Sequence, residues 1–134
     1  MPLALACVLL DVESSGGKNV FSALPPSGCG QPRGSEVTEQ SYAAYVASRD
    51  RCGQQGIGPL QLTWRPYQDE GDSLGGCWRP EVNCWVGFKA FASLLQRNSV
   101  ESALSRWNTG QPGSSAYATK ALGLLPGWQR VVDG

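Results

Sequence analysis

Residues 3–12 form the first hydrophobic segment of the chain, in which apolar side chains occupy almost every position. A run of this length without polar alternation predicts a helix that is buried on every side. The run ends at Glu13, and the segment 14–17 that follows contains two glycines, which commonly terminate helices. The hydrophobic pattern therefore predicts a buried helix with a carboxylate at its C-terminal end.

Helical patterns recur over residues 38–51, 67–74, 80–97 and 115–122 and after Ser99, with a final turn or two over 128–132. Thr38 and Ser99 are residue types that cap helix N-termini, and Pro80 fits a first helical position. In the helix that Pro80 begins, the apolar stripe from Trp85 to Leu95 has helical spacing and predicts the core face.

Strand patterns are scarce in comparison. Residues 56–62 combine two glycines with a short apolar stretch, which predicts at most a minor hairpin or an extended segment. The length of 134 residues and the apolar fraction of 41% suit one core. We therefore expect a mostly α fold, as a single domain over residues 1–134 with a small β or extended segment.

The charge pattern excludes several classes of partner. The formal net charge is +0 and the charges are spread along the chain, which does not suit a nucleic-acid-binding surface. No apolar stretch reaches the length of a membrane span. Residues 3–10 are too short for a signal peptide, and no basic segment precedes them. We expect a monomer that binds neither nucleic acid nor membranes and that is exported, if at all, without a signal peptide.

Five cysteines are many for a protein of the reducing cytosol. We expect disulfides between Cys29 and Cys52 and between Cys77 and Cys84, with Cys7 as a buried thiol in the first helix, although the sequence is compatible with other pairings. The spacing typical of zinc-binding cysteines is absent, so no metal site and no cofactor is expected.

The chain contains no histidine, and this absence excludes several common classes of catalytic site. Ser-His-Asp triads, Cys-His pairs and most zinc hydrolase sites all require imidazole. Proton transfer then depends on carboxylates, as in glycoside cleavage. Burial and the negative end of the helix dipole both disfavour the charged form of Glu13, which suits a general acid. The alternative is that Glu13 is merely the first polar residue after a core helix.

Three separated segments resemble the lysozyme-like superfamily of goose-type lysozymes and soluble lytic transglycosylases. They are residues 13–14, residues 56–62, and residues 107–110 with Tyr117 downstream. That family has a catalytic Glu followed by Ser at the end of a central helix, a G-x-G-L-M-Q-[IV] segment, and a Tyr-Asn-x-Gly segment with a later Tyr. The resemblance extends from Glu13 to Tyr117 and implies a lysozyme-like fold.

Two further stretches narrow this resemblance. Residues 58–63 and 75–80 read Gly-Pro-Leu-Gln-Leu-Thr and Gly-Gly-Cys-Trp-Arg-Pro, and they look most like the catalytic domains of endolysins from phages of actinobacteria. The chain also departs from the family pattern. Residues 59–60 are Pro-Leu instead of Leu-Met, and Trp107 replaces the usual Tyr, which keeps an aromatic wall but loses a hydroxyl. Thr63 stands where goose-type enzymes often carry Asp.

The resemblance implies a muramidase that cleaves the β-1,4 bond between N-acetylmuramic acid and N-acetylglucosamine, with Glu13 as general acid and no cofactor. Its partner would be the glycan strands of peptidoglycan, at the bacterial cell wall during host lysis. A phage-encoded protein of this kind would be released through a holin or exported by another route. A chitinase-like enzyme and a catalytically silent wall-binding module on the same fold are alternatives.

A second carboxylate would decide the mechanism. An inverting hydrolase needs one at roughly 6.5–9.5 Å to activate water, whereas a lytic transglycosylase uses the 6-hydroxyl of its substrate and forms an anhydro sugar. Asp50 is the first candidate, since it precedes the glycine segment, with Glu36 and Glu39 behind it. The other interpretation of Asp50 is a charge at a helix end, paired with Arg49 or Arg51.

The remaining site residues follow from the resemblance. Gln61, Trp107, Asn108 and Tyr117 would bind substrate, and the Tyr117 hydroxyl would contact Glu13. Each residue also has a structural interpretation. Gln61 can be an ordinary hydrogen-bonding side chain, Asn108 a helix terminator, and Tyr117 part of the core.

Overall fold

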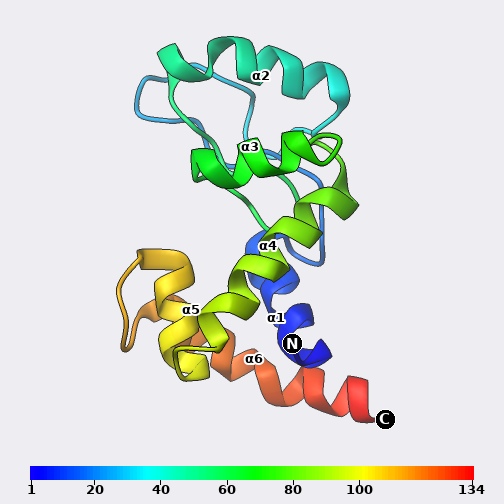
Figure 1. The fold of residues 1–134 in the computed structure, drawn as a ribbon, viewed down its shortest axis with the longest axis vertical. Helices are drawn as coiled ribbons and strands as arrows, with labels where there is room; N and C mark the ends of the chain where they lie inside the picture. The colour runs from blue at the N-terminus through cyan, green and yellow to red at the C-terminus, as the bar shows by residue number, and fades with distance from the viewer. The chain divides into compact units, whose positions relative to one another are not determined.

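The computed structural model describes all 134 residues and contains six helices and no strand (Figure 1). The helices are α1 (Leu3–Ser14), α2 (Glu39–Cys52), α3 (Arg65–Ser73), α4 (Pro80–Leu95), α5 (Val100–Thr109) and α6 (Ala116–Asp133). The mostly α fold expected from the sequence is confirmed, and β structure is limited to three isolated bridges. No helix is both long enough and apolar enough to cross a membrane.

Residue contacts divide the chain into two compact units, one of residues 1–12 and 88–134 and one of residues 13–87. In the first unit, α1 buries Ala4, Leu5, Val8 and Leu9, which lie on one face of the helix. The side chain of Leu3 is 63% exposed, so the prediction of burial on every side is wrong. Asp11 is the only polar residue of the run 3–12, so the sequence pattern does not define an exposed face, and tertiary packing determines which side of α1 is exposed.

Helices α5 and α6 pack against each other in the same unit. The predicted cap at Ser99 is confirmed, since its side chain accepts a hydrogen bond from the backbone N–H of Ser102. Helix α6 is continuous through Pro126, where the sequence pattern predicted two shorter pieces. Its Trp128 Nε1 donates to Asp11 of α1 at 3.2 Å, which ties the last helix to the first.

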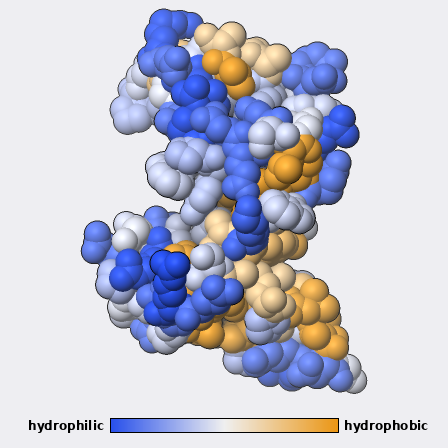
Figure 2. Space-filling view, in the orientation of Figure 1, coloured by the Kyte–Doolittle hydropathy of each residue, from blue (hydrophilic) through white to orange (hydrophobic).

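Apolar side chains remain on the surface of this unit. Figure 2 shows hydrophobic surface where α1 begins and α6 runs. The exposed apolar residues of these two helices include Leu3, Val131 and Val132. Single exposed apolar residues are ordinary on protein surfaces and need no functional explanation.

The second unit is built on α2 and α3. Thr38 and Ser41 form a reciprocal capping box at the start of α2, as the sequence predicted. The buried face of α2 contains Tyr42, Tyr45 and Arg49. Because these positions recur at helical spacing, one side of an otherwise exposed helix packs into the unit.

Gln68 of α3 is the centre of a buried polar network in this unit, and its side chain is fully buried. Its Oε1 accepts from the Tyr45 hydroxyl at 3.1 Å and from Arg49 Nη1 at 2.9 Å. Its Nε2 donates to the backbone carbonyls of Gln55 at 3.0 Å and Leu62 at 2.9 Å. One amide therefore joins α2, α3 and the segment between them.

Asn83 of α4 holds the glycine segment in the same way. Its Nδ2 donates to the carbonyl of Ile57 at 2.7 Å, and its Oδ1 accepts from the N–H of Leu60 at 3.0 Å. The buried face of α4 contains Asn83 and Val86, whereas Trp85 is 54% exposed. The prediction that the face beginning at Trp85 is buried is therefore wrong, because a different face of α4 packs into the core.

The hairpin predicted over residues 56–62 is present in minimal form. Ile57 and Leu62 exchange two backbone hydrogen bonds, at 3.0 and 3.2 Å, around a four-residue turn. Gly58 in this turn has φ +78°, and a Cβ there would lie 2.6 Å from Asn83 Nδ2. Glycine is required at this position both by its backbone angle and by the approach of Asn83.

The cysteines are paired in part as predicted. The disulfide between Cys29 and Cys52 is confirmed, and Cys7 is a free, half-buried thiol. Cys77 and Cys84 are both free thiols, so the second predicted disulfide is wrong. The neighbour of Cys77 on α4 is Asn83, whose Nδ2 lies 3.8 Å from its sulfur. Consecutive helical residues point about 100° apart, which turns Cys84 away from Cys77.

Peptide mapping without reductant is expected to recover one disulfide, between Cys29 and Cys52. Iodoacetamide at pH 8 should modify Cys84 much faster than Cys77 in the folded protein. Burial raises the pKa of the Cys77 thiol to about 12 and leaves its side chain with no exposed surface, while the reactive species is an accessible thiolate. A peptide that links Cys77 to Cys84, or equal labelling of the two thiols, would contradict this account.

Candidate functional site

A cavity of about 370 Å³ lies at the end of α1, within the unit of residues 13–87. It is lined by residues 13–15, 20–23 and 33–34 together with Lys18 and Gln61. Its volume falls within the range of small-molecule sites, about 300–1,000 Å³. The cavity joins the end of a helix, the loop that follows it and the glycine segment.

Glu13 contributes the only carboxylate to the lining of this cavity. It lies in the last turn of α1 and is half-buried, as the apolar run predicted. The helix stops directly after it, because Ser15, Gly16 and Gly17 all have φ between +55° and +104°. The carboxylate thus lies at the negative end of α1 and at the edge of a solvent-accessible hollow.

Ser14 fixes this helix end to the glycine segment. Its buried Oγ donates to the carbonyl of Pro59 at 2.7 Å and accepts from the N–H of Gly17 at 3.0 Å. The sequence marked Ser14 only as the neighbour of Glu13, because a serine after an apolar run has no distinctive pattern. The hydrogen bonds show why a serine follows Glu13, since it holds the backbone that carries the carboxylate.

Gln61 lines the same cavity, so the structure brings together two of the residues predicted for the site. Its Nε2 donates to the carbonyls of Val20 and Gly58, both at 2.9 Å. Both amide hydrogens are therefore used within the fold, and Oε1 is the atom left to accept a hydrogen bond from a ligand. A Cβ at Gly56 would lie 2.9 Å from this oxygen, so Gly56 makes room for it.

The backbone of Gln61 is strained. Its φ of +50° lies in the left-handed region, which residues other than glycine seldom adopt. Strain of this kind costs of the order of 1–3 kcal/mol and is concentrated at functional sites. The two hydrogen bonds of Nε2 hold the residue in this conformation and direct its side chain to the cavity.

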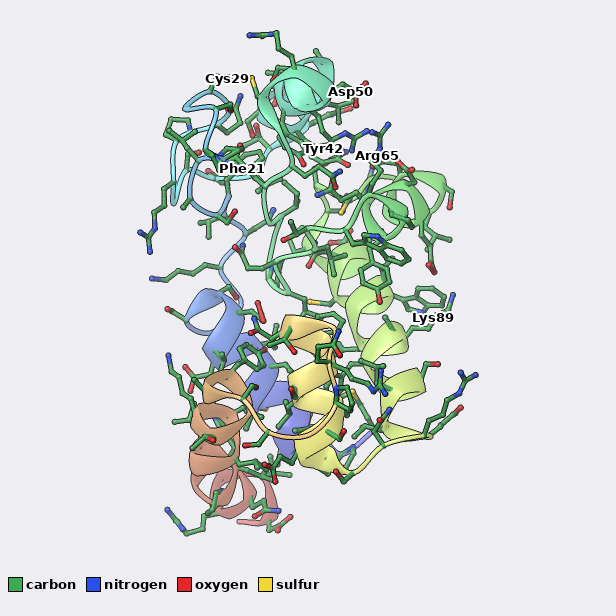
Figure 3. The ribbon with its side chains drawn as sticks, turned by 90° about the vertical axis from the view of Figure 1, so that its left-hand side faces the viewer. Phe21, Cys29, Tyr42, Asp50, Arg65 and Lys89 are labelled. Carbon is green, nitrogen blue, oxygen red and sulfur yellow. A yellow bond between two sulfur atoms is a disulfide. The ribbon has the colours of Figure 1, made fainter.

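Asp50 is not part of this cavity. It lies on the exposed side of α2 with 90% of its side chain accessible, and Arg65 Nη1 is 3.1 Å from its Oδ1. Arg65 also contacts Asp69 at 3.1 Å, and Figure 3 labels Asp50 and Arg65 near each other and Phe21, which lines the cavity, at a separate place. The geometry therefore matches the interpretation of Asp50 as a charge near a helix end, but its partner is Arg65 and not Arg49 or Arg51.

For a protein with the glycosidase activity that the resemblance implies, replacing Asp50 by Asn is expected to change neither that activity nor the melting temperature beyond experimental error. An exposed ion pair contributes little to stability, and Asp50 does not reach the cavity that contains Glu13. The measurements are the rate of sugar release from peptidoglycan and thermal unfolding. A loss of rate by a factor of a hundred with an intact fold would return Asp50 to the mechanism.

Trp107, Asn108 and Tyr117 belong to the other unit. Trp107 packs edge-on against the buried Phe91, with ring centroids 5.9 Å apart. Asn108 is exposed in the last turn of α5, and Tyr117 is half-buried in the first turn of α6. Gly110, with φ +79°, caps α5, so the helix terminator is this glycine and not Asn108. Substrate binding by these three residues stays a prediction.

The cavity also contains two cations that the sequence did not single out. Lys18 and Arg33 are both exposed residues of its lining. They lie in loops without periodicity, and isolated basic residues in a loop have no sequence signal of their own. With Glu13 they make the charged part of the site, two positive groups and one negative.

The chain matches no protein-family model, no curated protein and no solved structure.

Proposed function

We propose that this protein breaks the β-1,4 glycosidic bond of peptidoglycan between N-acetylmuramic acid and N-acetylglucosamine, with Glu13 as the general acid. The observation that carries the proposal is the convergence of Glu13 and Gln61, 48 positions apart, on one cavity at a helix end. The likeness of three segments to lysozyme-like enzymes, described above, supports the same assignment. The absence of histidine leaves a carboxylate as the natural proton donor.

The chemistry follows from the parts of the cavity. Glycosidic cleavage requires a proton on the leaving oxygen, which the Glu13 carboxyl supplies. The hydrogen bonds of Ser14 hold the end of α1 in place, so that this carboxyl has a defined position. Gln61 Oε1 accepts a hydrogen bond from an N-acetyl N–H or a sugar hydroxyl and orients the ring.

The single carboxylate of the lining favours a lytic transglycosylase over a hydrolase. In that reaction Glu13 gives its proton to the leaving oxygen and then accepts one from the 6-hydroxyl of the muramic acid. The oxygen of this hydroxyl bonds to C1, which forms a 1,6-anhydro ring without consuming water. Mass spectrometry of the fragments distinguishes the two reactions, since an anhydro end lacks one water and resists borohydride reduction.

We propose bacterial cell lysis as the setting, with the glycan strands of the wall as partner. The experiment that tests the activity is incubation of the protein with purified, insoluble peptidoglycan. Sugar fragments should enter solution in proportion to time and to enzyme concentration. Protein that sediments with the wall but releases nothing would be a wall-binding module, and cleavage of chitin oligomers in preference to peptidoglycan would indicate a chitinase.

A further inference from the structure

Lys18 and Arg33 line the cavity without an ionic partner in the protein. The salt bridges of Arg49 and Arg65 are formed with Asp50 and Asp69, and neither cation of the cavity takes part in them. Both residues are exposed and belong to the lining of the cavity, so their charged groups are accessible to a ligand there. A site with one carboxylate and two unpaired cations carries an excess of positive charge.

Backbone hydrogen bonds are formed by Lys18 itself and by Gly34, the residue after Arg33. The N–H of Lys18 donates to the carbonyl of Ser14 at 3.3 Å, directly after the helix that ends with the catalytic segment. The N–H of Gly34, next to Arg33, donates to the carbonyl of Phe21 at 2.9 Å. The two charges are thus attached to separate, ordered parts of the same cavity.

Positive charge at this place opposes the proposed reaction unless the substrate is anionic. The sugar develops positive charge as its glycosidic bond breaks, and neighbouring cations raise the energy of that state. A neutral glycan such as chitin offers nothing to offset this cost. Peptidoglycan does, because each muramic acid can carry a peptide with free carboxylates.

We propose that Lys18 and Arg33 bind carboxylates of the stem peptide and so make the protein selective for peptide-bearing glycan. This inference rests on the proposed function and adds a substrate class to it. The interaction is between exposed charges, so it is screened over about 8 Å at physiological ionic strength. The selectivity therefore decreases as salt is added.

The test compares the double variant K18Q/R33Q with the wild type on two substrates, peptide-bearing glycan strands and the same strands after their carboxylates have been converted to amides. The variant should lose about five- to tenfold in kcat/KM on the first substrate at low salt, since exposed ion pairs contribute a few-fold each. The loss should be in KM, and the rate on the amidated strands should not change. The control is R97Q/K120Q, with the same charge change on exposed residues outside the cavity.

The possible results separate this inference from the proposed function. A wild type that cleaves peptidoglycan while K18Q/R33Q retains its rate, or loses it equally on both substrates, overturns the inference alone. A wild type that cleaves no glycan overturns the proposed function. In that case, calorimetric titration with a soluble disaccharide-peptide decides the inference: binding that K18Q/R33Q weakens and R97Q/K120Q does not supports it, and equal or absent binding overturns it.

Discussion

We expect the replacement of Glu13 by Gln to abolish the proposed release of sugar fragments from purified peptidoglycan and to leave the fold unchanged. The amide has nearly the shape of the carboxyl but has no acidic proton to donate. General acid catalysis contributes about 10²–10⁴ in rate, so the remaining activity falls below the background of a fragment-release assay. Circular dichroism and the melting temperature verify the fold, since Glu13 is half-buried at a helix end and the substitution leaves no cavity.

The matched control for this substitution is Glu39→Gln. Glu39 is an exposed carboxylate in the first turn of α2, outside the lining of the cavity, and undergoes the same chemical change. It should retain the wild-type rate. Full activity of Glu13→Gln, or an equal loss in both variants, would exclude Glu13 as the specific proton donor.

Replacement of Gln68 by Leu should have the largest effect on stability, about 1–3 kcal/mol for each buried polar group that loses its hydrogen-bond partner. Leucine provides no acceptor for the buried Arg49 guanidinium, whose Nε already has no hydrogen-bond partner. It also leaves the Leu62 carbonyl without its donor from Gln68. Native stability is about 5–15 kcal/mol, so this loss is a large part of it. Chemical denaturation followed by tryptophan fluorescence measures the change.

Two further substitutions test the cause of this effect. Gln68→Glu keeps an acceptor for Tyr45 and Arg49 but loses the two donors, so its stability should lie between the wild type and Gln68→Leu. Gln54→Leu changes an exposed glutamine and should alter stability by a few tenths of a kcal/mol. If Gln68→Leu were as stable as the wild type, the network would have no structural importance.

The helix ends were predictable from the sequence because their chemistry is local. Thr38 and Ser99 bond to backbone groups three residues away, and glycine after residue 13 permits the backbone angles that stop α1. These interactions depend on neighbours in the chain, which a sequence displays. The fold class followed from the same signals, summed over the chain.

The buried faces and the cysteine pairing were less predictable, because they depend on distant contacts. Helix α4 has apolar residues on both sides, and one of its fully buried positions is the polar Asn83, which hydropathy assigns to the surface. The same rule concealed Gln68 on a short polar helix. Cys77 and Cys84 are close in sequence, but the rotation of α4 directs Asn83 to Cys77.

Only some residues of the candidate site could be predicted from the sequence. Glu13 stood out because a carboxylate ends an apolar run, and Gln61 because its segment resembles the G-x-G-L-M-Q motif of lysozyme-like enzymes. Lys18 and Arg33 were identified as site residues only from the lining of the cavity, because isolated basic residues in loops show no pattern in a sequence. Asp50 was chosen for its position in the chain, and its side chain instead pairs with Arg65 on the surface.

The most direct test of the central claim is the position of the bond that the wild-type protein cuts in purified peptidoglycan. Mass spectrometry of the soluble fragments should find disaccharide-peptides that begin with N-acetylglucosamine and end with muramic acid, in its anhydro form if the reaction is a transglycosylation. Peptides without sugar, or a wall that releases no fragment, would contradict a glycosidase that uses Glu13 as its acid.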